Sequence, residues 1–310
     1  MNGVLNLLKP PGCTAHSAVL EVRRLLGVRA GHAGTLDPDV AGVLPVLLGS
    51  ATRLAEFLLA WDKGYRAEVT FGAVSDTGDW TGSLRPRCPD SPVAEADLVE
   101  ALPAFLGEVE QVPPMVSAVK VGGVPLYRLA RQGRVVERPA RRVRVFRLDL
   151  VRFWPGPPPR ALLDIVCSKG TYVRALCQDL GLRLGCGAYM SYLVRTRAGP
   201  LALEEALTLA EAADLKARGL LEPRLLDPAR ALEHLPPIRL DQDGARRVSA
   251  GGQPVLDRGT EVAGGLEPGG LVRLLDPAGR LVAVAEGRER PGRPGAVELR
   301  LRKVLAQGPR

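Results

Sequence analysis

Aromatic residues are scarce in this chain of 310 residues, in which 5 Phe, 5 Tyr and 3 Trp make up only 4%. A surface that binds nucleic acid by stacking many bases on aromatic rings is therefore not expected. The 3 His show no metal-ligand spacing, so we expect no bound metal. The 5 Cys are an odd number without a Cys-x-x-Cys pair, which predicts reduced thiols rather than a disulfide framework.

Long apolar runs are also missing, and we expect no contact with a membrane. The first residues lack the basic region and apolar core of a signal peptide, which predicts a cytoplasmic protein. The sequence contains no Gly-x-x-x-x-Gly-Lys-Ser/Thr phosphate loop, no His-Glu-x-x-His motif and no complete dinucleotide-binding glycine motif. If the protein carries out a reaction, we expect it to need no cofactor.

Positive charge is in excess, with a net charge of +8 and a pI of about 9.6. This favours an anionic partner, and nucleic acid first, although a basic pI alone can reflect solubility. Because aromatic residues are few, phosphate contacts and shape recognition would supply most of the binding. Between residues 120 and 147 the charge is dense, with Arg128, Arg131, Arg134, Arg138, Arg141, Arg142, Arg144 and Arg147. The alternative for this segment is a solvated charged face.

Apolar periodicity predicts an α+β fold in the first part of the chain, because strands and segregated helices both occur. A helix is expected after residue 14, with Thr14 or Ser17 as its N-cap. Further helices are expected at residues 52–60, 94–106 and 171–184. Strands are expected at residues 65–71, 143–153 and 161–168, and a loop at residues 76–90.

The composition changes near Leu235-Pro236-Pro237, which predicts a domain boundary. Beyond it, short apolar segments alternate with glycine turns, a pattern typical of a small β-barrel. The expected strands are residues 253–256, 271–275, 281–285 and 296–301. We therefore predict two domains, at residues 1–232 and 236–307.

One carboxylate lies in a glycine-rich loop, Gly31-His32-Ala33-Gly34-Thr35-Leu36-Asp37-Pro38. The glycines allow backbone angles that other residues avoid, and Pro38 fixes the angle after the acid. An acid held on a tight loop suits a nucleophile or general base. Asp before Pro is also a common turn signal, so the loop alone does not establish catalysis.

A phenol and a guanidinium on separate segments complete a possible constellation. Tyr65 could stack on a flat heterocycle. Arg174 beside Asp37 would keep the carboxylate ionised and oriented. The structural alternatives are that Tyr65 is a core residue and that Arg174 is a surface charge on a helix.

Five ordered sequence blocks lie at residues 9–14, residues 31–38 continuing to 45, residues 62–65, residues 113–131 and residues 167–188. Together they resemble the bacterial tRNA pseudouridine-55 synthases, the TruB-type family. The resemblance covers roughly the first two-thirds of the chain, and the order and spacing of the blocks agree with the family. Val116, Val194 and Ala33 depart from the residues usual in the family, but none belongs to the Asp37, Tyr65 and Arg174 set.

The resemblance implies a catalytic domain with a mixed, mainly antiparallel sheet flanked by helices, followed by a PUA-like RNA-binding domain. It implies that residues 120–147 grip RNA. It also implies isomerisation of the uridine at position 55 in the T-loop of tRNA, after the base has left the stack. Asp37 would be the nucleophile, Tyr65 would stack on the uracil, and Arg174 would pair with Asp37.

The remaining candidate residues bind substrate or RNA by the same resemblance or by their charge. Leu193 would pack beside the base, and His32 would contact the RNA as the base is extruded. The other candidates are Tyr172, Lys9, Lys169, Arg141 and Arg142. The sequence leaves open whether Asp37 attacks C1′ or C6 and which base removes the C5 proton, for which Tyr65 is a candidate.

Two other functions remain compatible with the sequence. One is a non-catalytic tRNA-binding or tRNA-folding protein that uses the same surface. The other is a synthase that depends on a guide RNA; the absence of long Lys-rich tails favours the form that acts alone, so no guide RNA is expected. A methyltransferase would need a cofactor-binding glycine motif that the sequence lacks. We expect a monomer.

Overall fold

A computed structural model gives the fold and describes all residues except 89–92, 118, 255–268, 290–296 and 306–310. Its centre is a 9-stranded sheet whose main path runs β1-β3-β12-β4-β11-β10-β7, with β2 paired to β3 and β13 paired to β12. The strands are β1 Gly3–Lys9, β2 Ala30–His32, β3 Ala41–Leu48, β4 Lys63–Phe71, β7 Gly107–Gln111, β10 Arg141–Trp154, β11 Arg160–Cys167, β12 Ala188–Ala198 and β13 Leu201–Ala202. Within the described part of this sheet only β3 and β12 pair in parallel, which confirms the mixed, mainly antiparallel prediction.

The parallel pairing of β3 and β12 depends on a glycine. Gly42 lies opposite Arg195 in the register and has a φ of +120°. A Cβ atom at Gly42 would lie 2.3 Å from the Arg195 carbonyl oxygen, so only glycine allows the two backbones to approach this closely. This contact joins the N-terminal strands to the rest of the sheet.

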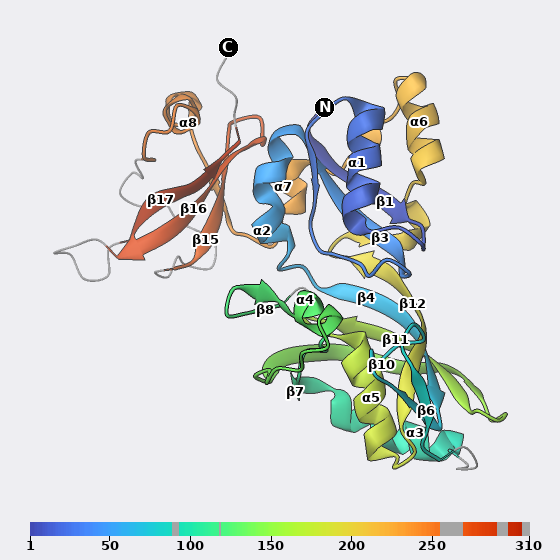
Figure 1. Cartoon of the computed structure of the whole chain (residues 1–310). Helices are drawn as coiled ribbons and strands as arrows, with labels where there is room; N and C mark the ends of the chain where they lie inside the picture. The colour runs from blue at the N-terminus through green and yellow to red at the C-terminus, as the bar shows by residue number, and fades with distance from the viewer. Residues whose placement is uncertain (89–92, 118, 255–268, 290–296, 306–310) are drawn as a thin grey trace.

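Two groups of helices cover the sheet (Figure 1). α1 Ala15–Leu26 and α6 Leu209–Ala217 lie beside β1 and β3, and α5 Val173–Arg183 and α3 Glu95–Ala101 lie in the other half of the sheet. The Thr14 side chain accepts a hydrogen bond from the Ser17 backbone N–H, so Thr14 is the N-cap of α1. Val19 and Val22 of α1 are buried against β1 and β3 in one apolar cluster, as the 3.6-residue period predicts.

Two expected helices are shorter than predicted. Residues 52–60 form the end of the 3₁₀-helix η1 Gly49–Leu54 followed by α2 Ala55–Leu58. Residues 94–106 form α3 and then the 3₁₀-helix η2 Leu102–Phe105. Pro103 lacks the N–H that a continuing α-helix would require, which explains the change at Leu102. The expected loop at residues 76–90 contains β6 Leu84–Pro86, which pairs with β5 Ala73–Ser75.

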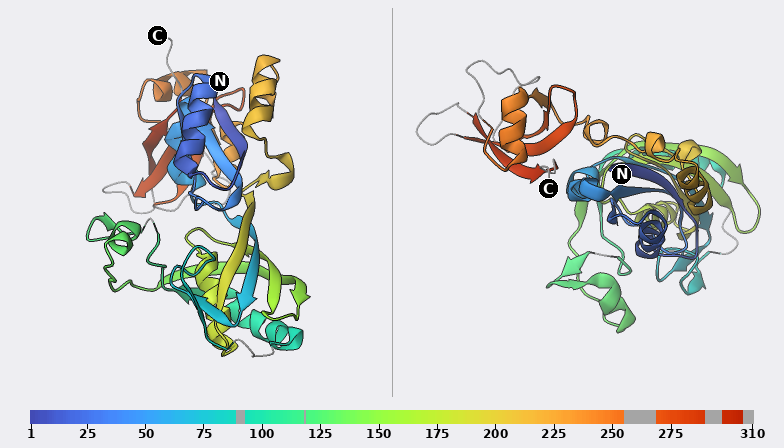
Figure 2. Two further views of the ribbon diagram at one scale, coloured as in Figure 1. Left: turned by 45° about the vertical axis from the view of Figure 1, so that its right-hand side comes forward. Right: turned by 90° about the horizontal axis from the view of Figure 1, so that it is seen from above.

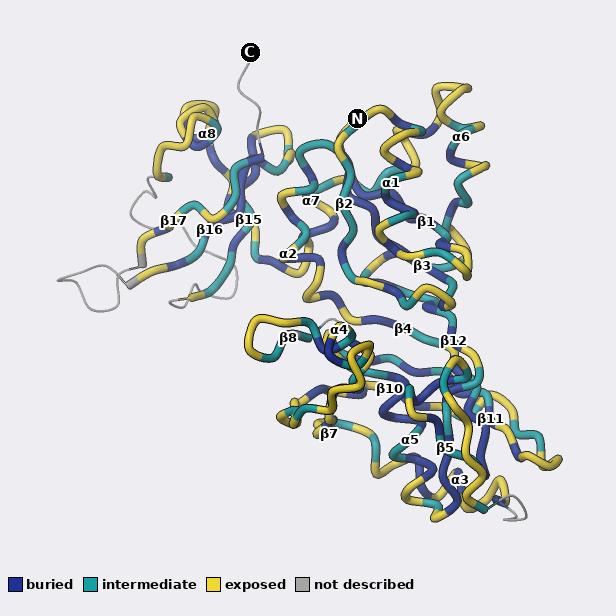
Figure 3. The backbone as a smooth tube through the Cα atoms, viewed as in Figure 1, coloured by how far each residue is buried: buried dark blue, intermediate teal, exposed yellow. Residues whose placement is uncertain are grey.

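The first part of the Arg-rich segment, residues 120–140, leaves the body of the molecule, as both views in Figure 2 show, whereas residues 141–147 belong to β10 of the central sheet. The first part contains β8 Lys120–Val121, β9 Val124–Pro125 and α4 Leu126–Arg131, and then leads into β10. Figure 3 shows the β8–β9 turn as exposed, in contrast to the buried strands of the central sheet. The segment is therefore open to a partner.

The C-terminal part is a separate four-stranded sheet with the order β14-β15-β16-β17. Its elements are β14 Pro237–Arg239, α8 Gln242–Ser249, β15 Leu271–Leu275, β16 Leu281–Glu289 and β17 Val297–Val304. These agree with the predicted strands at residues 271–275 and 281–285. Of the strand predicted at residues 253–256, residues 253 and 254 are not in a strand, and residues 255 and 256 lie outside the described residues. The start of the strand predicted at 296–301 also lies outside them.

The two sheets are joined by packing as well as by the chain. Val284 and Leu305 share an apolar cluster with Leu54 and Phe57 of the η1–α2 segment. An ion pair of 3.0 Å links Lys303 Nζ to a Glu56 carboxylate oxygen. The other short elements are η3 Leu203–Glu205, η4 Glu222–Arg224 and α7 Pro228–Ala231. In the described part of the chain, no helix is long and apolar enough to cross a membrane.

Candidate active site

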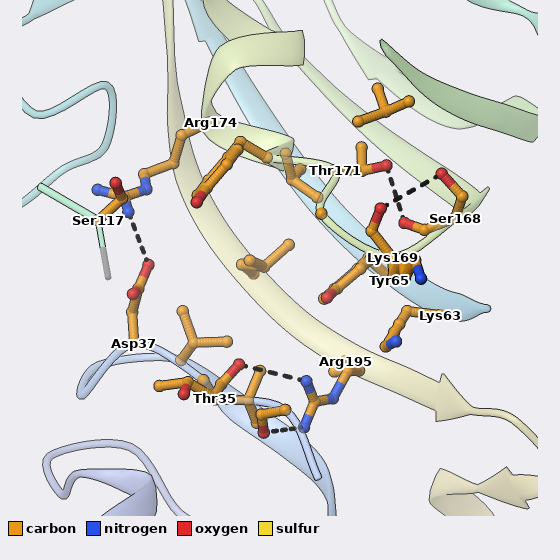
Figure 4. A pocket seen from close by; sticks show the side chains of 18 of the residues that line it. Thr35, Asp37, Lys63, Tyr65, Ser117, Ser168, Lys169, Thr171, Arg174 and Arg195 are labelled. Carbon is orange, nitrogen blue, oxygen red and sulfur yellow. Dashed lines mark hydrogen bonds and ion pairs between the residues drawn. The ribbon is translucent and has the colours of Figure 1, made fainter. Parts of the chain in front are cut away.

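A cavity of about 560 Å³ opens between the acid loop, the sheet and the start of α5. It is lined by Asp37 from the loop, Tyr65 from β4, Arg174 from α5 and Leu193 from β12 (Figure 4). These four residues come from segments far apart in the sequence. The fold therefore brings the three predicted catalytic residues and the predicted base-packing residue to one place.

Asp37 lies beside a guanidinium that is itself fixed by the protein. Arg174 Nη2 is 3.2 Å from Asp37 Oδ2, and Arg174 Nη1 is 3.2 Å from Asp79 Oδ2. The Arg174 side chain is 6% exposed and that of Asp79 9%, whereas that of Asp37 is 47% exposed. Arg174 also donates to the Val116 carbonyl at 2.8 Å. The guanidinium is thus held from behind and presents one edge to the accessible carboxylate.

Asp79 is anchored in turn by its own loop. Its Oδ1 accepts hydrogen bonds from the Thr81 hydroxyl at 2.6 Å and from the Thr77 hydroxyl at 2.7 Å. These donors fix the orientation of the Asp79 carboxylate. Asp79 is therefore built to hold Arg174, not to react.

Two buried cations hold the acid loop through its carbonyl groups. Lys9 Nζ donates to the carbonyls of Pro10, Pro38 and Val40, each at 2.8 Å. Arg195 Nε donates to the Val43 carbonyl at 2.6 Å, and its two Nη atoms donate at 3.4 Å to the carbonyls of Gly34 and Thr35. Lys9 is 0% exposed and Arg195 is 1% exposed. Both cations stabilise the loop from beneath.

Tyr65 lies beside Arg195 and a third buried cation, Lys63. Figure 4 shows its ring in the cavity wall near Lys63 and Arg195. Burial raises the pKa of the Tyr65 phenol, and the positive charge of Arg195 opposes this rise. Burial, together with the nearby Arg195 charge, lowers the pKa of Lys63 to about 8. Lys63 Nζ donates to the carbonyls of Leu59 and Trp61, so it supports the cavity wall.

The charge state of Asp37 results from opposing effects. Burial raises the pKa of the Asp37 carboxyl, Arg174 lowers it, and the nearby Asp79 charge raises it again. The net shift is upward. The ion pair with Arg174 and partial access to solvent thus favour the ionised carboxylate, which burial disfavours.

Most of the other candidate residues lie at the same cavity. Tyr172, Lys169, Arg141 and Arg142 line it, with both arginines exposed at the start of β10. His32 is half-buried on β2 and is not among the residues that line the cavity. Burial lowers the pKa of His32, which favours the neutral imidazole.

Lys9 does not face RNA in this arrangement. It is fully buried, and its three carbonyl partners occupy all the hydrogen atoms of its ammonium group. The sequence-based assignment of Lys9 to RNA binding therefore finds no support in the geometry. The free energy cost of burying its charge explains why so many carbonyl groups converge on it.

Three residues of this site were not singled out from the sequence. Asp79 lies 95 positions from Arg174, in a segment whose composition predicted only a loop. Arg195 follows the Leu193 motif, but nothing in the sequence reveals its carbonyl partners in the acid loop. Ser117 belongs to one of the family-like blocks and lines the cavity, but its block carried no assigned role.

A metal is not needed to explain the arrangement of these side chains. Across the described ranges, no group of three or more His, Cys, Asp or Glu residues is placed to hold a metal ion. Among the charged groups that line the cavity, Asp37 and Arg174 are paired with each other, and Lys63 and Arg195 donate to carbonyl groups. The site can position an ionised carboxylate next to a bound, planar ligand.

Two family models match the chain. One, described as TruB family pseudouridylate synthase (N terminal domain), matches residues 23–173. The other, described as tRNA pseudouridylate synthase B C-terminal domain, matches residues 174–232. The matched residues include Asp37, Tyr65 and Arg174. Residues beyond 232 lie outside both matches.

Several proteins named tRNA pseudouridine synthase B are similar to this chain. The protein from Symbiobacterium thermophilum is 55% identical over 83% of this chain and 84% of its own length. The one from Pelotomaculum thermopropionicum is 48% identical over 93% of this chain and 92% of its own length. The one from Pseudomonas aeruginosa is 44% identical and covers 92% of each chain.

Solved structures resemble the whole fold. A chain from the crystal structure of a Cbf5-Nop10-Gar1 complex superposes with a TM-score of 0.78 at 29% identity, covering 98% of this chain and 85% of that chain. A chain from an H/ACA RNP bound to a substrate RNA containing 2′-deoxyuridine gives a TM-score of 0.74 at 27% identity, with 98% and 85% covered. The similarity includes the C-terminal sheet, since almost the whole chain is matched.

Proposed function

Because the chain belongs to the TruB family of pseudouridylate synthases and is a tRNA uridine isomerase, we propose that Asp37 is its nucleophile and position 55 of the T-loop its target. One observation carries the assignment of Asp37. Among the described residues that line the cavity, Asp37 is the only Asp or Glu, and no His or Cys lines it either. A nucleophile must reach the substrate in its charged form, and Asp37 is both accessible and paired with Arg174.

The cavity suits a single extruded base. A uridine in a folded RNA loop is not accessible to a side chain until it leaves the stack, which costs a few kcal/mol. Tyr65 and Leu193 offer an aromatic and an aliphatic surface to the uracil. The C1′–N1 bond then breaks, the base turns within the cavity, and a C1′–C5 bond forms. C5 loses a proton and N1 gains one. Substrate and product have the same atoms, so the reaction consumes no co-reactant, and we propose that it needs no cofactor.

The surface around the cavity favours a large anionic substrate. Arg141 and Arg142 stand exposed at its rim, and the projecting segment carries Arg128, Arg131 and Arg134. We propose that this segment, with boundaries near residues 120 and 147, grips the T-arm through its phosphates. We further propose that residues 236–307 form a PUA-like domain that binds RNA beside the catalytic domain of residues 1–232. Location in the cytoplasm stays a prediction from the sequence.

A second candidate is a subunit that acts only within a ribonucleoprotein. The titles of the similar solved structures name Nop10, Gar1 and an H/ACA RNP as what those proteins assemble with. The greater identity to proteins named tRNA pseudouridine synthase B favours an enzyme that acts alone, as a monomer and without a guide RNA.

The test is pseudouridine mapping of an unmodified tRNA transcript incubated with purified wild-type protein or with Asp37→Asn, without any other RNA or cofactor. We expect pseudouridine in the T-loop with the wild type only. Full activity of Asp37→Asn would reject the nucleophile assignment. Absence of product with both proteins, followed by product after addition of a guide RNA, would favour the ribonucleoprotein subunit.

A further inference from the structure

A hydroxyl group without a partner lies in the wall of the cavity. Ser117 is 7% exposed, and its Oγ has no hydrogen-bond partner among the residues that the structure describes. A buried hydroxyl without a partner costs free energy, typically as much as a lost hydrogen bond. Ser117 lines the cavity but its Oγ is shielded from solvent in the free protein, so a rotation of the side chain about χ1 would present the hydroxyl to whatever fills that space.

The position of Ser117 is fixed by its neighbours. Its carbonyl oxygen accepts a hydrogen bond from the Tyr127 backbone N–H at 3.0 Å. The carbonyl of the preceding residue, Val116, accepts one from Arg174 at 2.8 Å. Ser117 therefore follows a residue bonded to the same guanidinium that contacts Asp37. Its hydroxyl lacks a partner although the backbone around it is fixed by hydrogen bonds.

The position of Ser117 in the cavity indicates which part of the nucleotide it would contact. Figure 4 shows Ser117 beside Arg174 and Asp37, across the cavity from Tyr65. In the proposed function, the uracil lies against Tyr65, and Asp37 reaches the junction of sugar and base. The ribose then lies on the Ser117 side, where its 2′-hydroxyl can both donate and accept a hydrogen bond.

We propose that Ser117 binds the 2′-hydroxyl of the extruded uridine and so helps the enzyme to select RNA over DNA at the target nucleotide. This inference rests on the proposed placement of the uridine. The 2′-hydroxyl is the group by which proteins distinguish the two sugars. A serine hydroxyl suits this contact because it rotates to match either polarity of the bond.

The experiment measures equilibrium binding of a T-arm stem–loop RNA with either uridine or 2′-deoxyuridine at the target position. Both RNAs are titrated against Asp37→Asn and against Asp37→Asn with Ser117→Ala. We expect Ser117→Ala to weaken binding of the uridine RNA roughly two- to tenfold and to leave the deoxyuridine RNA unchanged. This coupling isolates the contact between the two hydroxyl groups. An equal effect on both RNAs, or no effect on either, would overturn the proposal.

Thr171→Val is the matched control. Thr171 also lines the cavity, but its hydroxyl already donates to the Ser168 carbonyl at 2.9 Å. Replacing Thr171 by Val should change the affinity for both RNAs by the same factor. A selective loss of affinity for the uridine RNA would show that removal of any hydroxyl in the cavity produces the coupling, and this would reject the specific role of Ser117. Ser117→Ala should not lower the Tm of the free protein, and a drop of several degrees would reveal an internal partner and also reject it.

The two proposals fail in different ways. The RNA recovered from the Asp37→Asn titration is analysed for pseudouridine. Product in that sample would reject Asp37 as nucleophile, whatever the coupling. Unreacted RNA together with zero coupling would reject the role of Ser117 alone.

Discussion

Arg174 and Asp79 form the buried half of the site, with Arg174 Nη1 3.2 Å from Asp79 Oδ2 and both side chains less than 10% exposed. The other half of the same guanidinium faces Asp37. Since a flexible arginine could point in many directions, Asp79 determines where the charge next to the nucleophile lies. The orientation of Asp37 thus depends on a residue that does not line the cavity.

Asp79→Asn should lower kcat at least tenfold while RNA affinity changes little. The variant keeps the shape of the side chain but loses the charge that orients Arg174, and we expect a loss of about 2 kcal/mol in the free energy of unfolding. Single-turnover rates and RNA titrations measure the two effects. Asp214→Asn, which alters an exposed ion pair with Arg218, is the control and should change neither. Unchanged turnover in Asp79→Asn would show that Arg174 is positioned by other contacts.

Activity should fall in acid at a higher pH than for an ordinary carboxylate. The pKa of Asp37 is raised by burial, in opposition to Arg174, and the reaction needs the ionised form. The rate should therefore increase as the pH rises through the folded-state pKa of Asp37 and then level off. A pH profile of the single-turnover rate measures this, and a rate that is constant down to the usual carboxyl range would contradict the raised pKa.

The same shift predicts that Asp37→Asn is more stable than the wild type at neutral pH. A carboxyl group whose folded-state pKa is raised contributes stability below its unfolded-state pKa and loses it as the pH rises through the folded-state value. The wild type is therefore penalised at pH 7, and the neutral amide is not. The difference in Tm between the two proteins should shrink as the pH falls below the unfolded-state pKa. A variant that is less stable at pH 7 would mean that pairing with Arg174 outweighs burial.

Replacing both Arg141 and Arg142 by Gln should weaken tRNA binding and flatten its salt dependence. Each phosphate contact that is lost should reduce the slope of log K against log salt by about 1. Arg142 also lies 3.6 Å from Glu110, but both side chains are mostly exposed, so little stability should be lost. Arg24→Gln on α1, where Arg24 pairs with Glu21, is the control. An unchanged slope in the double variant would show that Arg141 and Arg142 do not contact phosphates.

Removal of all residues after Pro236 should weaken RNA binding and also lower the Tm. The cut would expose Leu54 and Phe57, which pack against Val284 and Leu305. Turnover at saturating RNA, measured below the new Tm, should remain because no residue that lines the cavity is removed. A collapse of saturating turnover in a protein that is still folded would make the C-terminal unit part of the active site.

The sequence predicted the segments with strong local patterns. The N-cap Thr14, the strand around Tyr65 and the helix that begins near Arg174 each depend on neighbours a few residues away. The prediction did not include β12, because two irregularities in its pairing with β4 interrupt the alternation of buried and exposed residues. The C-terminal sheet was predicted only where short strands are flanked by glycine turns.

The site residues that lie in the family-like sequence blocks could be predicted from the sequence. Asp37, Tyr65 and Arg174 were named, and the structure brings them to one cavity. The burial of Lys9 and the anchoring role of Arg195 were not predicted, because both depend on carbonyl groups that residue types do not reveal. The Arg195 contact with Val43 joins positions 152 residues apart. Arg195 and Val43 come together only when β12 and β3 pair in the sheet.

The anchoring of the acid loop makes catalytic competence a late result of folding. Lys9 enters from β1 and Arg195 from β12, and the loop they hold lies just before β3. Contacts between residues so far apart in the sequence form slowly, because bringing them together costs loop-closure entropy. A partly folded chain would already contain the nucleophile, yet the loop would have no fixed shape. The enzyme thus acquires its reactive geometry only once the first and the last of these strands have met.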